Sequence, residues 1–412
     1  MPFALGRFAF LAGALFALLS AMQVHAAVTF IGIGTCPGDA SDLSGLKGMQ
    51  SDGTPHNRLG GQGSAIAYSG RGNSYVLASD RGPKDSNDVI CRVHEMEIVV
   101  TPGGKHAVEL KLTATTLLTN ETGKFFVGHG KAFDPLTPTK SRRLDPEGIR
   151  VGPRGTLFIA DEFGPFLYEF DRKGKRLRSL PVPVKFQPAN PGAHAEQELP
   201  PHNTVGRQPN RGFEGLAITP DGGKLFAAMQ CPLIQDGALD KENKRVGHNN
   251  RLLEVDVKTG ASREFVYVMD HHDSNVCEIL AVNDHTFLIL ERDGKGGKDA
   301  AFKNVFLIDM TGATDVSGVA ALPTGTLPKE IVPVKKTLFL DLLDPRFGIA
   351  AEETPEKFEG LAFGPDLPDG RRLLIVTADN DFVATVPFRV YAFAVDTPEL
   401  PGYVPQVFEK GK

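Results

Sequence analysis

The 412-residue sequence contains no tryptophan and only four cysteines, and its formal net charge is −5. No two cysteines have CxxC spacing, which argues against a zinc ribbon or finger. The small net charge gives no electrostatic reason to expect a nucleic-acid partner. A GxSxG motif is also missing, which argues against an α/β-hydrolase esterase. After the first 26 residues no apolar run is long enough to predict a membrane span.

The N-terminus has the features of a secretory signal peptide. Arg7 precedes an apolar stretch from Phe8 to Leu19, and Val24-His25-Ala26 offers small residues at the positions that a signal peptidase reads. We therefore predict a signal peptide over residues 1–26, cleavage after Ala26, and a periplasmic or secreted protein. Losing Arg7 would change the formal charge from −5 to −6.

The remaining residues, 27–412, are predicted to form a single domain. All four cysteines lie in this part: Cys36, Cys91, Cys231 and Cys277. An even cysteine count in an exported chain predicts two disulfides, and the sequence leaves all three pairings open.

A short pattern recurs four times along this domain. The copies read DPEGIRVGPRGTLFIADE, GFEGLAITPDGGKLFAAMQ, NVCEILAVNDHTFLILERD and KFEGLAFGPDLPDGRRLLIVTADND. Each has a glutamate at the start of an apolar-alternating run, then a turn, a second apolar run and a polar end. The four glutamates are Glu147, Glu214, Glu278 and Glu359. Period-2 alternation between turn residues predicts a strand–turn–strand unit.

Further apolar runs extend each copy to four strands, which is the blade of a β-propeller. A degenerate earlier copy, GSAIAYSGRGNSYVLASDRG, has Ser64 in place of the glutamate and Asp80 at its polar end. The sequence therefore predicts an all-β propeller with five visible blades. A sixth could be assembled from Val28–Ile33 and poorly matching segments. Alternatively, that N-terminal strand completes the last blade, which would avoid an open sheet edge.

The first strand of each blade lines the channel of a propeller, so the repeated acids are expected to converge. Carboxylates held close together must protonate, pair with a cation or bind a metal. Oxygen ligands favour Ca²⁺ or Mg²⁺. We predict a Ca²⁺ site whose ligands come from both strands of the repeated hairpin: Glu147, Glu214, Glu278, Glu359, Asp80 and Asp161. The alternative is that each glutamate fastens its blade to the next.

Three arginines accompany the acids, and arginine binds phosphate and carboxylate groups well. Arg81 follows Asp80, Arg211 opens RGFEG, and Arg292 lies in ERDGKGGK. They predict a small anionic substrate or ligand, with surface or inter-blade salt bridges as the alternative.

The motifs NRLGGQGSAIAY, ASDRGP, LDPEGIRVGPRGTLFIADEFGPFLYEFDRKGK, RGFEGLAITPDGGKLFAAMQCPL and KFEGLAFGPD resemble the phytase-like family, described as having esterase-like activity of phytase. The resemblance runs from about Leu43 to the C-terminus. It implies a propeller, export and phosphoester hydrolysis with Ca²⁺. Alkaline phytases hold calcium in an acid-lined channel, and the analogy points to the same acidic positions. Ser64 and Gln230 depart from a uniform acidic ring.

Together these features predict an exported Ca²⁺-dependent hydrolase of phosphoesters or related esters. Glu147 and Glu214 would act as ligand or base, Arg211 would assist catalysis, and Arg81 and Arg292 would hold substrate oxygens. A lactonase on the same architecture and a non-enzymatic binding or scaffold propeller are the alternatives. The sequence does not determine the oligomeric state.

Overall fold

Twenty β-strands form five four-stranded antiparallel sheets in the computed structural model, which describes residues 27–82, 89–134, 140–192 and 194–409. The predicted signal peptide, residues 1–26, lies outside the described residues. Helical structure in the described ranges consists of 3₁₀ turns of three or four residues, and none is long and apolar enough to cross a membrane. The predicted all-β propeller is confirmed, with five blades.

The five sheets follow the order of the chain except at its ends. Their strands are β2 (Ala65–Tyr68), β3 (Ser74–Ala78), β4 (Arg92–Val100) and β5 (Val108–Leu117); β6 (Pro146–Val151), β7 (Leu157–Asp161), β8 (Phe166–Phe170) and β9 (Arg176–Leu180); β10 (Phe213–Ile218), β11 (Lys224–Met229), β12 (Asn249–Asp256) and β13 (Ser262–Val268); β14 (Asn275–Ala281), β15 (Thr286–Arg292), β16 (Lys303–Asp309) and β17 (Lys335–Asp341); and β18 (Phe358–Phe363), β19 (Arg372–Ala378), β20 (Phe388–Val395) and β1 (Val28–Cys36). The 3₁₀ turns are η2 (Gly130–Ala132), η4 (Val184–Phe186), η5 (Ala195–Glu198), η6 (Ile234–Asp236), η7 (Gly297–Asp299), η8 (Pro345–Phe347), η9 (Ala351–Glu353) and η10 (Thr397–Glu399).

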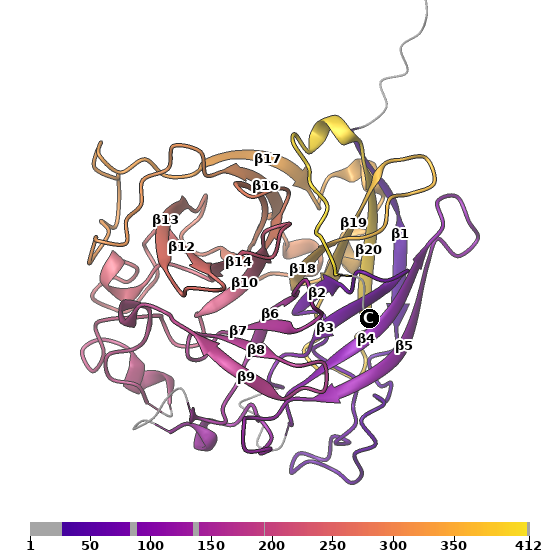
Figure 1. Cartoon of the computed structure of the whole chain (residues 1–412), viewed down its shortest axis with the longest axis horizontal. Helices are drawn as coiled ribbons and strands as arrows, with labels where there is room; N and C mark the ends of the chain where they lie inside the picture. Colours follow the sequence, from indigo (N-terminus) through magenta and orange to yellow (C-terminus); the bar gives the residue numbers. More distant parts are fainter. Residues whose placement is uncertain (1–26, 83–88, 135–139, 193, 410–412) are drawn as a thin grey trace, which may run out of the picture.

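The blades close into a ring through the two ends of the chain. Figure 1 shows β1, in indigo, beside the yellow strands of the last blade, where β1 pairs antiparallel with β20. At the centre each first strand contacts the first strand of the next blade, and β18 contacts β2. Val28–Ile33 therefore belongs to the fifth blade, as the second of the two sequence-based alternatives predicted, and does not begin a sixth.

The core is divided among the interfaces between blades. One cluster joins Ala65 and Val76 of one blade to Ile149 and Ile159 of the next. The innermost strands are buried on both faces, so β6, β10 and β18 have no exposed residue, whereas Leu340 is the one buried residue of the outermost strand β17. Burial on both faces explains the nearly continuous apolar character of the inner strands.

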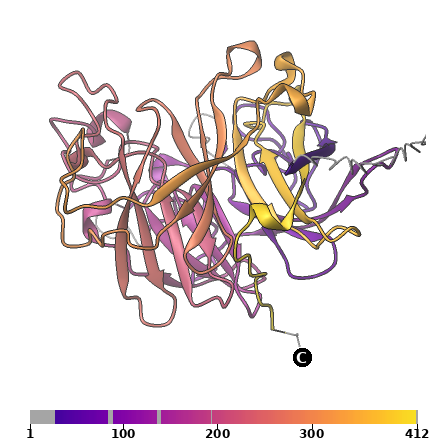
Figure 2. The same ribbon diagram turned by 90° about the horizontal axis from the view of Figure 1, so that it is seen from above.

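The C-terminal strap, residues 401–409, crosses the far ends of the first strands. Its backbone donates from Val404 to Val282, from Val407 to Pro220 and from Glu409 to Pro153, which follow β14, β10 and β6. The rings of Tyr403 and Phe363 are 4.9 Å apart. Figure 2 shows this yellow segment leaving the last blade and running toward the chain end. The strap thus closes one end of the channel over an apolar cavity of about 250 Å³.

The predicted disulfides are not formed: all four cysteines are free. The propeller explains why, because Cys91, Cys231 and Cys277 belong to three different hydrophobic clusters between blades. The thiol of Cys91 donates to the carbonyl of Leu144 instead. Large apolar inter-blade cores stabilise this chain without cross-links, unlike the cores of small secreted domains.

Candidate functional site

Four of the five first strands carry a β-bulge near their N-terminal end. The register of the first hairpin shifts between Pro146 and Gly148, and the same shift recurs in the next three blades. The residues left out of the ladder are Glu147, Glu214, Cys277 and Glu359. A bulge leaves its extra residue unpaired and re-aims its side chain. The bulges therefore explain how a strand buried on both faces can present a polar group at the channel.

The fourth blade departs from the sequence alignment by one residue. Cys277, not Glu278, occupies the bulge, and Glu278 occupies the position held by Gly148, Gly215 and Gly360 in the other blades. At Gly215 an added Cβ would lie 2.7 Å from the Cα of Glu278, so the neighbouring strands approach closely there. The glycine thus permits close contact between neighbouring first strands.

Glu278 joins blades together rather than pointing at the other repeated acids. Its Oε1 accepts hydrogen bonds from the backbone N–H groups of Leu216 and Ile279, at 3.0 Å each. Nη2 of Arg150 lies 3.1 Å from the same oxygen. Burial raises the pKa of Glu278 to about 7, although Arg150 opposes that shift. These contacts match the blade-fastening alternative for this glutamate.

A second ring of side chains comes from the ends of the second strands. In each blade, the first-strand residue at the position of Gly148 pairs with a residue of the second strand. Two residues after that second-strand partner, the five blades carry Asp80, Glu162, Gln230, Arg292 and Asp379. We call these residues, together with Asp145, Glu147, Glu214, Lys357 and Glu359, the central cluster. Its carboxylates are almost fully buried, with exposed fractions between 0% and 8%.

Crowding of buried acids raises several pKa values in the central cluster. Burial is the main cause for Glu214, whose pKa rises to about 8, with a further contribution from the charge of Glu359. Burial and then the charge of Asp145 raise the pKa of Asp80 to about 7. The pKa of Glu147 is raised well above its usual range by burial, Asp80 and Glu214. Protons are therefore shared among these carboxyls at neutral pH.

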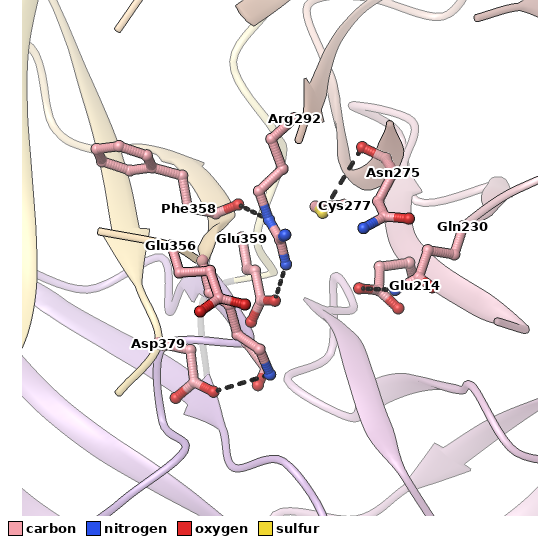
Figure 3. A network of polar contacts seen from close by, with 12 residues as sticks. Glu214, Gln230, Asn275, Cys277, Arg292, Glu356, Phe358, Glu359 and Asp379 are labelled. Atoms are coloured by element: carbon pink, nitrogen blue, oxygen red, sulfur yellow. Dashed lines mark hydrogen bonds and ion pairs between the residues drawn. The ribbon is translucent and has the colours of Figure 1, made fainter. Parts of the chain in front are cut away.

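Basic side chains neutralise part of this charge, as Figure 3 shows. Arg292 donates from Nη2 to Glu359 Oε1 at 2.6 Å, and from Nε to the carbonyl of Phe358 at 3.2 Å. Lys357 Nζ lies 3.9 Å from Asp379 Oδ2 and also pairs with Asp381. Gln230 Nε2 donates to Glu214 Oε1 at 2.6 Å. Arg292 is thus engaged with the protein, away from bulk solvent.

Asp145 and Glu162 form a second acidic pair, bridged by Arg81. Arg81 Nη1 pairs with Asp145 Oδ2 and lies 3.6 Å from Glu162 Oε2. The pKa of Asp145 is lowered, because Arg81 outweighs its burial with help from a hydrogen bond to Glu162. The pKa of Glu162 is raised well above its usual range by burial. Glu162 therefore holds a proton that it shares with the ionised Asp145.

The remaining predicted residues lie at the edge of this arrangement. Asp161 accepts backbone hydrogen bonds from Asp145 and Phe163 on Oδ1 and from Gly164 on Oδ2, so it stabilises a turn. Half-buried Arg211 donates to Gln230 Oε1 at 2.5 Å and to Asn275 Oδ1 at 2.9 Å. Both partners are neutral, so these contacts do not neutralise the positive charge of Arg211. The guanidinium is therefore suited to binding an anion.

Three groups of side chains bring possible cation ligands within 4.8 Å of one another. They are Asp80, Asp145 and Glu147; Asp80, Asp379 and Asp381; and Glu214, Cys277 and Glu359. The first two offer only oxygen, and the third adds sulfur. Asp80 Oδ1, Glu214 Oε2 and Asp379 Oδ2 are buried and accept no hydrogen bond from the described chain.

The structure brings Asp80, Glu147, Glu214, Glu359 and Arg292 into the central cluster. Arg81 contacts the cluster through Asp145 and Glu162, whereas Glu278 and Asp161 serve other contacts. Sequence reasoning missed Asp145, Lys357 and Cys277. Asp145 and Lys357 each stand two residues before a bulge glutamate, so extending the repeat alignment upstream could have found them. Cys277 could have been found only by shifting the fourth copy by one residue.

Comparison with known proteins agrees with the sequence resemblance. The family description "Phytase-like: Esterase-like activity of phytase" matches residues 57–382. An "Uncharacterized secreted protein" of Arthroderma benhamiae is 28% identical over 456 residues, covering 86% of each chain. Among solved structures, a GH43 β-1,3-galactosidase shares 11% identity with TM-score 0.42, covering 85% of this chain and 94% of its own. A periplasmic gluconolactonase of Pseudomonas aeruginosa shares 11% identity with TM-score 0.36, covering 88% and 99%. Since the family match spans most of the sequence, this chain belongs to the phytase-like family.

Proposed function

We propose that this protein is an exported hydrolase that holds Ca²⁺ in the central cluster and cleaves phosphoesters or related esters of a small anionic substrate. The observation that carries the proposal is the pair of buried oxygens Asp80 Oδ1 and Asp379 Oδ2, which accept no hydrogen bond from the described chain. A buried ionised oxygen without a donor is costly unless it is protonated or binds a cation. Family membership and the secreted relative support hydrolysis and export.

The donor chemistry around Asp80 fits calcium. Asp80 groups with Asp145 and Glu147 on one side and with Asp379 and Asp381 on the other, and every donor is a carboxylate oxygen. Ca²⁺ prefers six to eight oxygen ligands, so water or substrate oxygens would complete its shell. When bound, Ca²⁺ would neutralise substrate charge and lower the pKa of a water molecule.

Glu147 and Glu214 are the best candidates for proton transfer. The charge of Glu214 raises the pKa of Glu147, so ionisation of one carboxyl disfavours ionisation of the other. One carboxyl can then accept a proton from the attacking water while the other donates a proton to the departing alcohol. Water forms the new bond to phosphorus or the acyl carbon, and the bond to the alcohol oxygen breaks.

Arg211 is the arginine best placed to bind substrate oxygens. It is half-buried, and it donates hydrogen bonds to the neutral side chains of Gln230 and Asn275. Arg292 is 3% exposed and paired with Glu359, so binding substrate through Arg292 would require breaking that pair. Arg81 is more accessible than Arg292, since its side chain is 16% exposed, but it is already paired with Asp145.

Calcium-dependent stability tests the metal, and turnover tests the reaction. The exported chain, stripped with a chelator, should gain thermal stability with Ca²⁺ and much less with Mg²⁺. Glu147→Gln should abolish that gain, whereas Glu242→Gln, on an exposed turn, should retain it. The Ca²⁺-loaded protein should hydrolyse p-nitrophenyl phosphate or p-nitrophenyl acetate.

Each failure has a distinct meaning. Opening of a lactone without phosphoester turnover would favour the lactonase alternative. A calcium shift without turnover on any ester would favour a binding propeller. No calcium shift, with Glu147→Gln merely less stable, would overturn the metal-dependent hydrolase.

A further inference from the structure

The fourth blade places sulfur where three other blades place a carboxylate. Cys277 occupies the bulge position of Glu147, Glu214 and Glu359. Its side chain is fully buried, and its Sγ lies within 4.8 Å of one carboxylate oxygen each from Glu214 and Glu359. Figure 3 shows Cys277 between Glu214 and Arg292, with Glu359 on the other side of the arginine. Blade symmetry thus brings two oxygens and one sulfur together.

We propose that Glu214, Cys277 and Glu359 form a second cation site, which takes a thiophilic divalent ion of the Zn²⁺ class rather than Ca²⁺. The site differs in donor chemistry from the all-oxygen groups around Asp80. It shares Glu214 with the pair proposed to transfer protons, so its test uses metal binding and not turnover. Thiolate favours Zn²⁺ and similar borderline or soft ions, whereas Ca²⁺ favours oxygen alone.

An unsatisfied polar atom on one of the three side chains also supports the site. Glu214 Oε1 accepts from Gln230, but Oε2 of the same carboxylate is buried and accepts no hydrogen bond from the described chain. Glu214 as a residue is only 3% exposed. An oxygen held in this way needs a proton or a cation.

Charge balance also favours a divalent ion. Two carboxylates and a thiolate carry three negative charges, and Arg292, paired with Glu359, supplies one positive charge. A divalent ion would neutralise the remainder. Arg292 also donates to the carbonyls of Phe358 and Asp293, and these contacts fix its position beside Glu359.

The spacing is within reach of a tetrahedral site. Ligand atoms around Zn²⁺ stand about 3.5 Å apart at usual Zn–O and Zn–S bond lengths. The three ligand atoms lie within 4.8 Å of one another, which is compatible with this spacing. Three protein ligands leave the fourth position for water or substrate, the arrangement of catalytic rather than structural zinc sites.

Cadmium titration tests the proposal, because a cadmium–thiolate bond gives a charge-transfer absorption that carboxylates do not give. The exported chain carrying Cys36→Ser, which removes a partly exposed thiol, should develop this band with one equivalent of Cd²⁺. Cys277→Ser should abolish the band. Glu214→Gln should weaken Cd²⁺ binding by at least about tenfold.

Cys91→Ser is the matched control, since Cys91 is equally buried and also donates to a backbone carbonyl. It should leave the band unchanged. Circular dichroism would show whether Cys277→Ser still folds; if it does not, Glu214→Gln and Glu359→Gln decide the outcome through Cd²⁺ affinity. A band that survives Cys277→Ser, no band with stoichiometric Cd²⁺, or displacement of Cd²⁺ by equimolar Ca²⁺ would overturn the proposal.

Discussion

Nη2 of Arg150 lies 3.1 Å from Glu278 Oε1 and donates to the carbonyl of Ile279 at 2.7 Å. Nη1 of the same guanidinium donates to the carbonyl of Ile66 at 2.9 Å. One side chain from β6 therefore contacts β14, across the ring, and the neighbouring β2. Arg150 lies between the central cluster and the apolar cavity beneath the strap, so the channel is divided into a polar and an apolar part.

Removing this guanidinium should be strongly destabilising. Arg150→Met would leave Glu278 buried without its cation and free three backbone carbonyls, those of Ile66, Ile149 and Ile279. This should cost about 3–5 kcal/mol of unfolding free energy. Glu278→Gln keeps an oxygen that can accept from Arg150 and should cost less. Urea unfolding of both variants would measure the difference. Equal losses would contradict this order and would show that the charge of Glu278, rather than the hydrogen bonds that the amide keeps, accounts for the effect.

The close approach at the glycine positions should also be measurable. In Gly215→Ala the new Cβ would lie 2.7 Å from the Cα of Glu278, a backbone atom that cannot swing aside. We expect a loss of about 1–3 kcal/mol in unfolding free energy. Gly318→Ala is the control, because no atom lies within 4 Å of its added Cβ. A Gly215→Ala protein as stable as the control would show that the first strands can separate freely.

The fold was largely predictable from sequence, whereas the site was only partly so. Period-2 alternation and recurring turns identified five blades, because each blade repeats one local pattern. The register of the fourth copy was misjudged, since in NVCEIL the glutamate seemed equivalent to Glu214 while the bulge holds Cys277. Bulges depend on contacts with the neighbouring blade, which a local pattern does not contain. The same limit explains the free cysteines, because ring geometry separates their clusters.

The metal-free protein should lose stability as the pH rises from about 5 to 8. Asp and Glu carboxyls in an unfolded chain have pKa values near 4. Burial raises the pKa of Asp80 and Glu278 to about 7 and of Glu214 to about 8. The folded state therefore holds more protons, and the stability they contribute is full below about pH 4 and lost as pH passes 7–8.

Chemical unfolding in chelator at pH 5, 6.5 and 8 would measure this slope. Buried Cys277, whose pKa is also raised by burial, should add a further decline only above about pH 9, where an unfolded thiol ionises. Glu214→Gln removes one of the titrating carboxyls and should make the decline shallower. Stability that increases over this range would contradict the raised pKa values.

Deleting the strap should weaken the whole ring rather than one blade. Residues 403–409 donate backbone hydrogen bonds to three blades, and Gln406 Nε2 donates to the carbonyl of Val151 at 2.6 Å. Phe408 packs against Tyr68 of another blade, with ring centroids 5.9 Å apart. A chain ending at Gly402 would expose the apolar cavity and free these acceptors, so we expect a lower melting temperature.

Because the central cluster lies at the opposite end of the first strands, metal binding there should persist in the folded truncated protein. Loss of Ca²⁺ or Cd²⁺ binding below the melting temperature would instead show that the strap and the cluster are coupled through Arg150.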